Sequence, residues 1–297
     1  MCIRDSAYTL ALFAQDEIKL LRNLQALIGV RYIYHENFKN HATPNVALMY
    51  KPGKFNFRAS YAAGFRTPTL SELYATDIAK KNDRLTIGNL DLKPEKNNYF
   101  SLSAEYVHER FSVSVNAFYN NIRDMIDYNT IATGDKAMEQ YGHKEVRQRD
   151  NIAEAKVHGI NVSANAYLGA GFNLSGGYTH LNTQDVELEQ PIDKSIKNAY
   201  NINAQWAHSW KIYRLNINLN GRFNSKRFSK SYGYAPEYQL WDLNTRHSFN
   251  LKSVIIEPGC GMENLFDYMD DRPYNSNYAT LTPGRSFYIS LSLKFKS

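Results

Sequence analysis

Arginine and tyrosine residues in long polar segments are the candidates for chemistry in this sequence. The segments 66–97, 124–153 and 266–283 are the longest ones in which apolar and polar residues do not alternate. Guanidinium groups bind anions through paired hydrogen bonds, and tyrosine rings stack on aromatic or cationic groups. We therefore expect these three segments to shape a site for an aromatic or anionic small molecule. The candidates are Arg66, Tyr74, Arg84, Tyr128, Tyr141, Arg147, Arg149, Tyr274 and Tyr278.

Each candidate also has a simpler interpretation, as a solvated loop residue or as an aromatic residue at a membrane interface. The sequence contains no Gly-x-Ser-x-Gly and no His-Glu-x-x-His motif. Cys2 and Cys260 provide neither a disulfide framework nor the spacing of metal ligands. We expect no enzymatic activity, no cofactor and no bound metal.

Charge and hydropathy narrow the class of protein. The net charge is +6, but lysine and arginine are spread among acidic residues without a basic run, so nucleic acid is not an expected partner. No stretch approaches the ~20 apolar residues of a membrane helix. The mean hydropathy of −0.52 remains compatible with a β-barrel, in which only every second residue contacts lipid. The 22 Tyr and 15 Phe are enough for the aromatic girdles of such a barrel.

Alternation with a period of two residues recurs from Tyr8 to the end of the chain. In the segment 213–223, alternate positions are apolar except for Gly221, and the five positions between them are all Asn or Arg. Arg58, Arg214 and Arg222 all fall on polar stripes, where a polar lumen tolerates them and lipid would not. The pattern predicts about thirteen strands. Their predicted ranges are 8–20, 24–35, 44–51, 54–65, 98–108, 110–123, 154–168, 171–182, 199–211, 213–225, 238–249, 252–265 and 284–295.

Strand length and the connections favour a membrane barrel over a soluble sandwich. Most of the predicted strands have about 9–14 residues, the length of tilted membrane strands, whereas soluble strands average ~5–6. Short turns at 21–23, 51–54, 108–110, 168–171, 211–213 and 250–252 alternate with long connectors at 36–43, 66–97, 124–153, 183–198, 226–237 and 266–283. Barrels of outer membranes have short turns on one side and long loops on the other. We expect one short helical stretch, around 70–79.

Strand parity leads to an expectation about the start of the chain. An odd count places the two ends on opposite sides of the membrane, whereas bacterial single-chain barrels have even counts. We therefore expect strands to be missing upstream, with residues 7–297 forming the C-terminal portion of a barrel. Residues 1–6 have no apolar core or cleavage site of a signal peptide, and we interpret them as an artefactual leader.

Several segments resemble, in order, the C-terminal barrel of TonB-dependent outer-membrane receptors. Phe65, Arg66, Thr67 and Pro68 are similar to the Phe-Arg-Ala-Pro box of that family, with Thr67 in place of Ala. The segment 88–96, with Asn89, Leu90, Asp91 and Leu92, resembles a second box, with Leu90 in place of Pro. The segments 13–32, 116–126 and 151–159 also fit. The last matching box is Asn264, Leu265, Phe266 and Asp267, followed by 283–287.

The resemblance implies a receptor of about twenty-two strands with a plug domain in its lumen. Such a receptor lies in the outer membrane of a Gram-negative bacterium and takes up a scarce nutrient, such as a siderophore or cobalamin. The resemblance also implies lipid and the TonB complex as partners, the latter through the missing N-terminal part. Two departures stand out: Lys296 and Ser297 follow Phe295, where the family ends on an aromatic residue, and 69–87 lack the His of haem-binding members.

Other classes remain open at this point. A porin-like channel without a plug shares the alternation and the girdles, but it lacks the boxes. A soluble β-sandwich or carbohydrate-binding protein requires a closed apolar core. The boxes themselves also have a structural interpretation, because Pro68 stops strand pairing and 89–95 has the composition of a turn.

Overall fold

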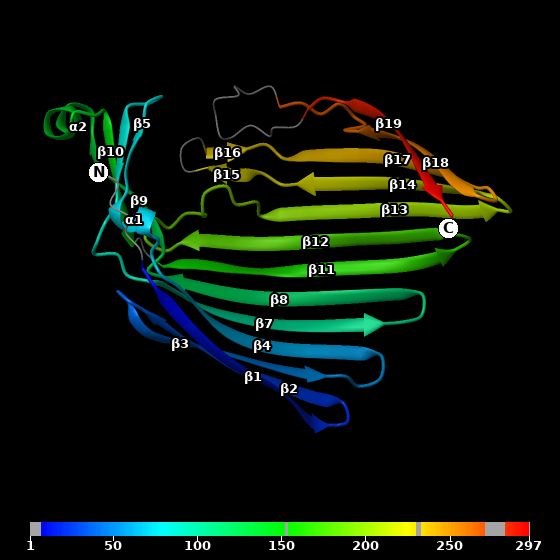
Figure 1. Ribbon diagram of the computed structural model, residues 1–297, viewed down its shortest axis with the longest axis horizontal. Helices are drawn as coiled ribbons and strands as arrows, with labels where there is room; N and C mark the ends of the chain where they lie inside the picture. Colours follow the sequence, from blue (N-terminus) through cyan, green and yellow to red (C-terminus); the bar gives the residue numbers. More distant parts are fainter. Residues whose placement is uncertain (1–6, 152–153, 230–232, 271–282, 297) are drawn as a thin grey trace.

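Thirteen long antiparallel strands form one curved sheet in the computed structural model, which describes residues 7–151, 154–229, 233–270 and 283–296. Each long strand pairs with the next long strand along the chain (Figure 1). The strands are β1 (Thr9–Leu21), β2 (Leu24–His35), β3 (Lys39–Tyr50), β4 (Phe55–Arg66), β7 (Glu95–Val107), β8 (Phe111–Arg123), β11 (Ala155–Gly169), β12 (Phe172–Asp185), β13 (Asn198–Trp210), β14 (Tyr213–Asn224), β17 (Tyr238–Asn250), β18 (Val254–Glu263) and β19 (Ser286–Phe295).

The number of strands predicted from the alternation is confirmed, and most predicted bounds lie within three residues of the observed ones. The tight turns are also where the pattern placed them. At 51–54, for example, Gly53 adopts a φ of 63°, which a residue without a Cβ reaches at no steric cost. The alternation of apolar and polar residues, which follows from the pleat of a strand, is therefore sufficient to locate the long strands.

The prediction for the connector 36–43 is wrong. β3 already begins at Lys39, so only residues 36–38 connect it to β2. Polar residues and Pro44 hide this part of β3 from an analysis of alternation. Pro44 is tolerated because the ladder between β3 and β4 begins only at the Asn45–Ala62 pair, which leaves this part of β3 with a partner on one side.

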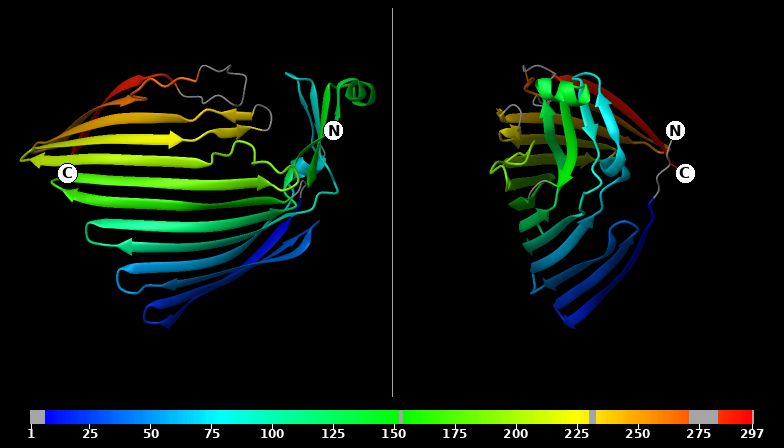
Figure 2. Two further views of the ribbon diagram at one scale, coloured as in Figure 1. Left: turned by 180° about the vertical axis from the view of Figure 1, so that it is seen from behind. Right: turned by 90° about the vertical axis from the view of Figure 1, so that its left-hand side faces the viewer.

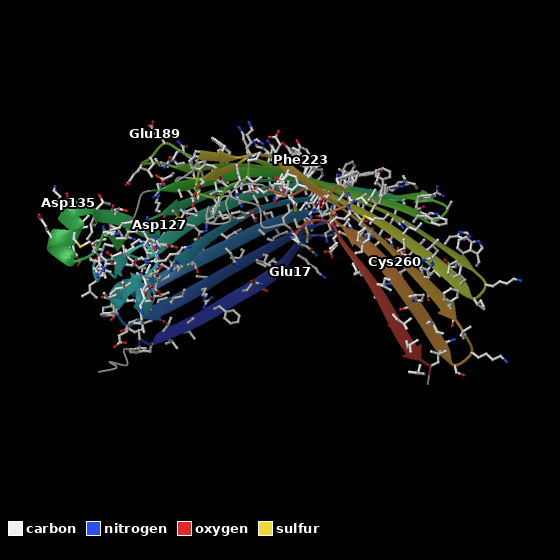
Figure 3. The ribbon with its side chains drawn as sticks, turned by 90° about the horizontal axis from the view of Figure 1, so that it is seen from above. Glu17, Asp127, Asp135, Glu189, Phe223 and Cys260 are labelled. Carbon is white, nitrogen blue, oxygen red and sulfur yellow. The ribbon has the colours of Figure 1, made fainter. Side chains whose placement is uncertain are left out.

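The two faces of the sheet differ in chemistry. Polar side chains on one face bond across neighbouring strands, for example Ser60 to Ser101 (Oγ–Oγ 2.6 Å) and Asn203 Nδ2 to Asn218 Oδ1 (2.7 Å). The other face carries most of the exposed large apolar side chains. Figure 3 shows the curvature of the sheet, with Phe223, a member of the apolar face, on its convex side. A polar concave face and an apolar convex face are typical of a membrane β-barrel wall.

Two rows of aromatic side chains border the apolar face. One row lies near the ends of the strands that lead into the long loops, and the other lies near the tight turns. The first row contains Tyr61, Phe100, Tyr119, Tyr178, Tyr200 and Phe223, with ring centroids 4.6 Å apart for Tyr178 and Tyr200. The second row contains Phe55, Tyr106, Phe111, Phe172, Trp206, Trp210, Tyr213 and Phe249. These rows match the girdles expected from the Tyr and Phe content.

The sheet is an open arc. Within the described residues no ladder joins β1 to β19, and Figure 2 shows the strands as a curved wall with two free edges. No helix in the described part of the chain has the length and apolarity needed to span a membrane.

The assignment of the two faces predicts unequal costs for neighbouring substitutions in β11. Val162 lies on the apolar face between the two aromatic rows, whereas Ser163 bonds to Ser114 on the polar face. In a lipid bilayer, Val162→Arg should destabilise the protein by about 2–4 kcal/mol, the cost of a charge on the lipid-contacting face of a barrel near mid-membrane. Ser163→Arg, on the polar face, should cost clearly less. Urea unfolding in lipid vesicles measures both. Equal costs would contradict the assignment.

Candidate functional site

Two long loops fold together at one end of the large sheet, on the left in Figure 1. The first loop supplies β5 (Thr76–Ala79) and β6 (Arg84–Ile87), and the second supplies β9 (Ile126–Thr133) and β10 (Glu145–Asn151). They form one four-stranded sheet in the order β5-β6-β10-β9, which we call the loop sheet. Its β6–β10 ladder is parallel and joins residues about sixty positions apart in the sequence. Neither loop completes this sheet alone.

Secondary structure inside the loops departs from the expectation of a single helical stretch around 70–79. The helix α1 is shorter, Leu70–Tyr74, because Ala75 adopts an extended conformation (ψ 138°). A second helix, α2 (Gly134–Tyr141), was not predicted. It has only eight residues, too few for a helical period to stand out in a window of about 11–18 residues. Gly142, at a φ of 72°, ends it in the left-handed conformation typical of helix C-termini.

Small apolar cores hold the loops in place. Leu85 and Val146 from the loop sheet pack with Ala137 of α2, and Val146 and Ala137 are fully buried. At the base of the loops, Leu73 of α1, Leu92 and Ile126 form a second buried cluster. Burial of such side chains contributes about 1.5–3 kcal/mol each, which is enough to order short loops that pack together. The two cores join the loops into one folded unit.

The opposite face of the loop sheet carries arginines. Alternation along β6, β9 and β10 places Arg84, Arg147, Arg149 and Tyr128 on the face away from α2. We call these four residues the arginine face. All four were candidates in the sequence, from two separate loops, and the loop sheet brings them together. Glu145, opposite Arg84 in the ladder, is the acidic residue of β10 on this face.

Local contacts orient these side chains. Arg149 lies over the Tyr128 ring, with Cζ 3.7 Å from the ring centroid, and it donates a hydrogen bond to the Tyr128 hydroxyl (2.5 Å). Arg147 donates Nε–H to Glu145 (2.6 Å). The Nε of Arg84 is buried, and no hydrogen-bond partner for it lies in the part of the chain that the structure describes. The arginine face therefore combines an excess of positive charge with donors that remain available to an anion.

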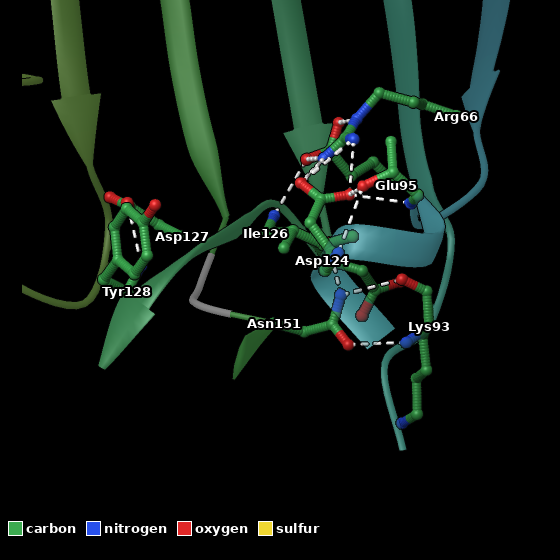
Figure 4. A network of polar contacts seen from close by, with 10 residues as sticks. Arg66, Lys93, Glu95, Asp124, Ile126, Asp127, Tyr128 and Asn151 are labelled. Atoms are coloured by element: carbon green, nitrogen blue, oxygen red, sulfur yellow. Dashed lines mark hydrogen bonds and ion pairs between the residues drawn. The ribbon is translucent and has the colours of Figure 1, made fainter. Parts of the chain in front are cut away.

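Arg66 has a different environment from the other arginines. It is the last residue of β4, and its guanidinium lies between two carboxylates (Figure 4). Its Nε and Nη2 donate to the two oxygens of Glu95 (both 2.6 Å), and its Nη1 donates to Glu72 (3.0 Å). The side chains of Glu72 and Glu95 are only 12% and 17% exposed. This ion cluster, Arg66 with Glu72 and Glu95, ties β4 to α1 and β7.

The ion cluster also reaches the second loop. Glu95 accepts the backbone N–H of Ile126, the first residue of β9 (2.8 Å). Glu72 forms a capping box with Thr69 at the start of α1. Burial alone would raise the pKa of Glu72, but hydrogen bonds from Arg66 and Thr69 outweigh it and hold the pKa below its ordinary value. Glu72 is therefore ionised at neutral pH.

Two further contacts connect the loops. The side chain of Asn151 donates to the carbonyls of Lys93 (2.9 Å) and Asp124 (2.6 Å) and accepts the N–H of Lys93 (2.6 Å), as Figure 4 shows. Farther out, Nδ1 of His143 lies 2.8 Å from the Asp83 carboxylate. This contact lowers the pKa of Asp83, which sits in the turn between β5 and β6. The loops are thus joined at both their base and their tip.

The motif residues occupy turns and cores. Pro68 and Leu92 are buried, Asn89 caps its own turn by accepting the N–H of Asp91 (2.9 Å), and Leu90 is exposed. Asn264 is 4% exposed and bonds to the backbone of Tyr268 and Pro283. Asp267 accepts the N–H of Arg285 (2.7 Å). Leu265 is half-buried, and Phe266 is exposed beside Trp241.

The remaining candidates are dispersed. Tyr74 is 50% exposed on α1, and Tyr141 is half-buried against the core under α2. Tyr274 and Tyr278 lie outside the described residues. Analysis of the sequence did not single out Glu72, Glu95 or Asn151. The Thr69-x-x-Glu72 spacing predicts the capping box. No sequence pattern predicts that Asn151 connects the two loops.

Comparison with known proteins gives a consistent result. A family model described as TonB dependent receptor-like, beta-barrel matches residues 3–265. A ferric enterobactin receptor mutant of Pseudomonas aeruginosa superposes with a TM-score of 0.77 at 21% identity, covering 98% of this chain and 45% of that protein. A siderophore receptor of Acinetobacter baumannii gives 0.77 at 17% identity, with 98% and 46% coverage. The ferric preacinetobactin receptor of the same species gives 0.71 at 17%, with 97% and 43% coverage. The chain thus spans less than half the length of these proteins.

The ion cluster predicts a specific change in the second loop. Glu95→Gln removes the charge that binds Arg66 and weakens the bond to the Ile126 N–H. Hydrogen bonds to charged groups contribute about 1.5–3 kcal/mol, so the local opening free energy at the Ile126 amide should fall by an amount near the lower end of this range, since Arg66 is partly exposed. Amide hydrogen exchange measures it.

Glu145→Gln provides the matched control. It breaks a comparable pair with Arg147 in the same loops but touches neither Arg66 nor Ile126. Exchange at Ile126 should stay unchanged in this variant. Unchanged exchange at Ile126 in Glu95→Gln would refute the link between the ion cluster and the second loop.

Proposed function

We propose that this chain, which belongs to the family of TonB-dependent receptor-like β-barrels, is part of an outer-membrane receptor for the TonB-energised uptake of a scarce nutrient. The convex apolar face would contact the lipid of a Gram-negative outer membrane, and the long loops would face the outside. The TonB complex would act through a part of the receptor outside these residues. The family comprises receptors and transporters rather than enzymes.

The arginine face is the observation that carries this proposal. Two loops at one end of the wall fold together and present Arg84, Arg147 and Arg149 beside Tyr128. The acidic residues on the same face are Glu145, which pairs with Arg147, and Asp77 of β5. An uncommitted guanidinium binds anions, and a tyrosine stacked with a cation offers an aromatic edge and a hydroxyl. Folding two loops into one unit also fixes these groups before a ligand arrives, which lowers the entropic cost of binding.

The ligand class follows from this chemistry. Positive donors and an aromatic ring suit an anionic chelator, and the similar solved proteins named above include receptors for ferric enterobactin and ferric preacinetobactin. We propose a siderophore-like anion as the ligand. A neutral sugar would gain little from three guanidinium groups. Cobalamin, the other nutrient considered from the sequence, has fewer anionic groups for this face to bind.

Energised uptake can be distinguished from passive flux. In cells that express the receptor containing this chain, accumulation of a labelled ferric siderophore should stop when the inner-membrane proton gradient is collapsed. A porin-like channel would instead admit small solutes down their gradient with or without that energy. Uptake that persists without the gradient would contradict the proposal.

Removal of charge from the arginine face should weaken binding. The triple variant Arg84→Gln, Arg147→Gln, Arg149→Gln loses several charge-assisted hydrogen bonds to an anion, so the Kd for a ferric siderophore should rise on the order of 100-fold or more. Intrinsic fluorescence titration of the purified receptor measures it. Because these side chains lie outside the apolar core that joins the loop sheet to α2, the fold of the loops should remain intact.

A control variant removes the same charge from the same loops. Lys80→Gln, Lys93→Gln, Lys136→Gln changes three exposed cations that lie off the arginine face. Its affinity should stay within about threefold of the parent, the scale of a long-range effect screened by salt. Equal losses in both triple variants would show general charge attraction and not a site.

A further inference from the structure

A cluster of cations lies on the convex face, beyond the aromatic row near the long loops. Lys96 of β7 and Arg123 of β8 are direct partners in the ladder, and both are exposed. Lys156 of β11 is the ladder partner of Asn121, two residues before Arg123. Three cations from three adjacent strands therefore occupy one small area of the face that bears the aromatic rows. We call them the convex cations.

This arrangement is unfavourable unless an anion is present. Like charges directly opposite each other on a sheet destabilise it, and diagonal neighbours are only ~7–8 Å apart. Glu154, 3.9 Å from Arg123, is the one carboxylate paired with them among the described residues. Lys96 and Lys156 make no ion pair or side-chain hydrogen bond within that same part of the chain. Three positive charges thus share one distant acidic partner.

A buried amide lies among the convex cations. Asn121 is 8% exposed, and its Oδ1 is buried without a hydrogen-bond partner among the described residues. The oxygen and nitrogen of an amide are interchangeable by a flip, so this side chain has a donor to offer at the same place. An unsatisfied buried polar group is destabilising, and a ligand with several acceptor oxygens would relieve that cost.

The height of the cluster identifies the kind of anion. Arg123 lies four residues beyond Tyr119 of the aromatic row, which is ~13 Å along the strand and roughly 9 Å along the membrane normal for a strand tilted by ~45°. Aromatic belts mark the edge of the hydrocarbon layer, so cations at this height reach the headgroup layer of the outer leaflet. The anions fixed in that layer are the phosphates of lipids.

We propose that Lys96, Arg123, Lys156 and Asn121 form a binding site for a phosphorylated lipid headgroup on the outer surface of the barrel wall. The site lies on the face opposite to the lumen and is separate from the arginine face. Its ligand would be a structural lipid and not the transported nutrient. The proposal rests on the membrane placement given under the proposed function but not on the identity of the nutrient.

The test uses the protein extracted from outer membranes and placed in phosphatidylcholine–detergent micelles. Phosphatidylglycerol is titrated in, and native mass spectrometry counts the lipids retained. The triple variant Lys96→Gln, Arg123→Gln, Lys156→Gln should weaken phosphatidylglycerol retention on the order of 100-fold, at about fivefold for each cation near a lipid surface. Glu154→Gln should strengthen it by about fivefold, because it removes the competing carboxylate.

The control variant is Arg110→Gln, Lys211→Gln, Lys252→Gln. It removes three exposed cations at the tight turns, on the other side of the membrane. It should retain phosphatidylglycerol at the convex cations as the parent does. Equal losses in the two triple variants, or no change in either, would overturn the proposed site. Inorganic phosphate that displaces the lipid at equal concentration would overturn the assignment to a lipid.

The outcomes also separate this site from the proposed function. A protein that retains neutral and anionic lipids equally well contradicts the headgroup site alone. A protein that retains no lipid of either kind contradicts the membrane placement itself.

Discussion

One constraint shapes this molecule: in an apolar environment every backbone N–H and C=O must find its partner inside the protein. Strands pair along almost their full length, as the twelve-residue ladder between β4 and β7 illustrates. Because the ladders satisfy the backbone hydrogen-bonding groups, only the side chains of the sheet can contact other molecules. These side chains alternate between the two faces. The convex face carries apolar and aromatic groups, and the concave face carries hydroxyls and amides that bond across strands, such as Ser60 to Ser101.

The long loops do not need complete internal backbone pairing, but they need enough buried apolar surface to become ordered. Outside the membrane, water can satisfy an irregular backbone, but an ordered binding surface still requires burial to offset the entropy lost on ordering. A loop of about thirty residues cannot bury much alone. The parallel pairing of β6 with β10 lets two loops share the cores around Val146 and Leu92. Deletion of one loop would therefore unfold the other, so loop deletions cannot assign ligand contacts to a single loop.

The wall was predictable and the loop unit was not, for a physical reason. Strand β14 is recognisable in the sequence because the two faces of the sheet require opposite residue types, apolar at Leu219 and polar at its neighbour Asn220. No such requirement acts on the loops, where pairing depends on contacts between residues far apart in sequence, as for Arg84 and Glu145. Even in the wall, β3 before Asn45 was missed, since polar residues and Pro44 mask its period. Residue type alone made the arginines candidates for ligand binding. The side chains that contact each arginine are known only from the fold.

Those neighbours divide the arginines by role. A guanidinium has five donors, and the bonds it already makes determine what it can offer a ligand. The donors of Arg66 bond to Glu72 and Glu95, so its contribution is to position the loops. Its place in a family motif had made it a candidate for ligand binding. Arg149 lies over a tyrosine ring, and among the described residues neither it nor Arg84 forms an ion pair with a carboxylate. The same accounting applies on the convex face, where Lys96 and Lys156 have no acidic partner among the residues that the structure describes. A guanidinium held between two carboxylates, like that of Arg66, therefore positions other residues, whereas cations with fewer carboxylate partners keep charge to offer an anion.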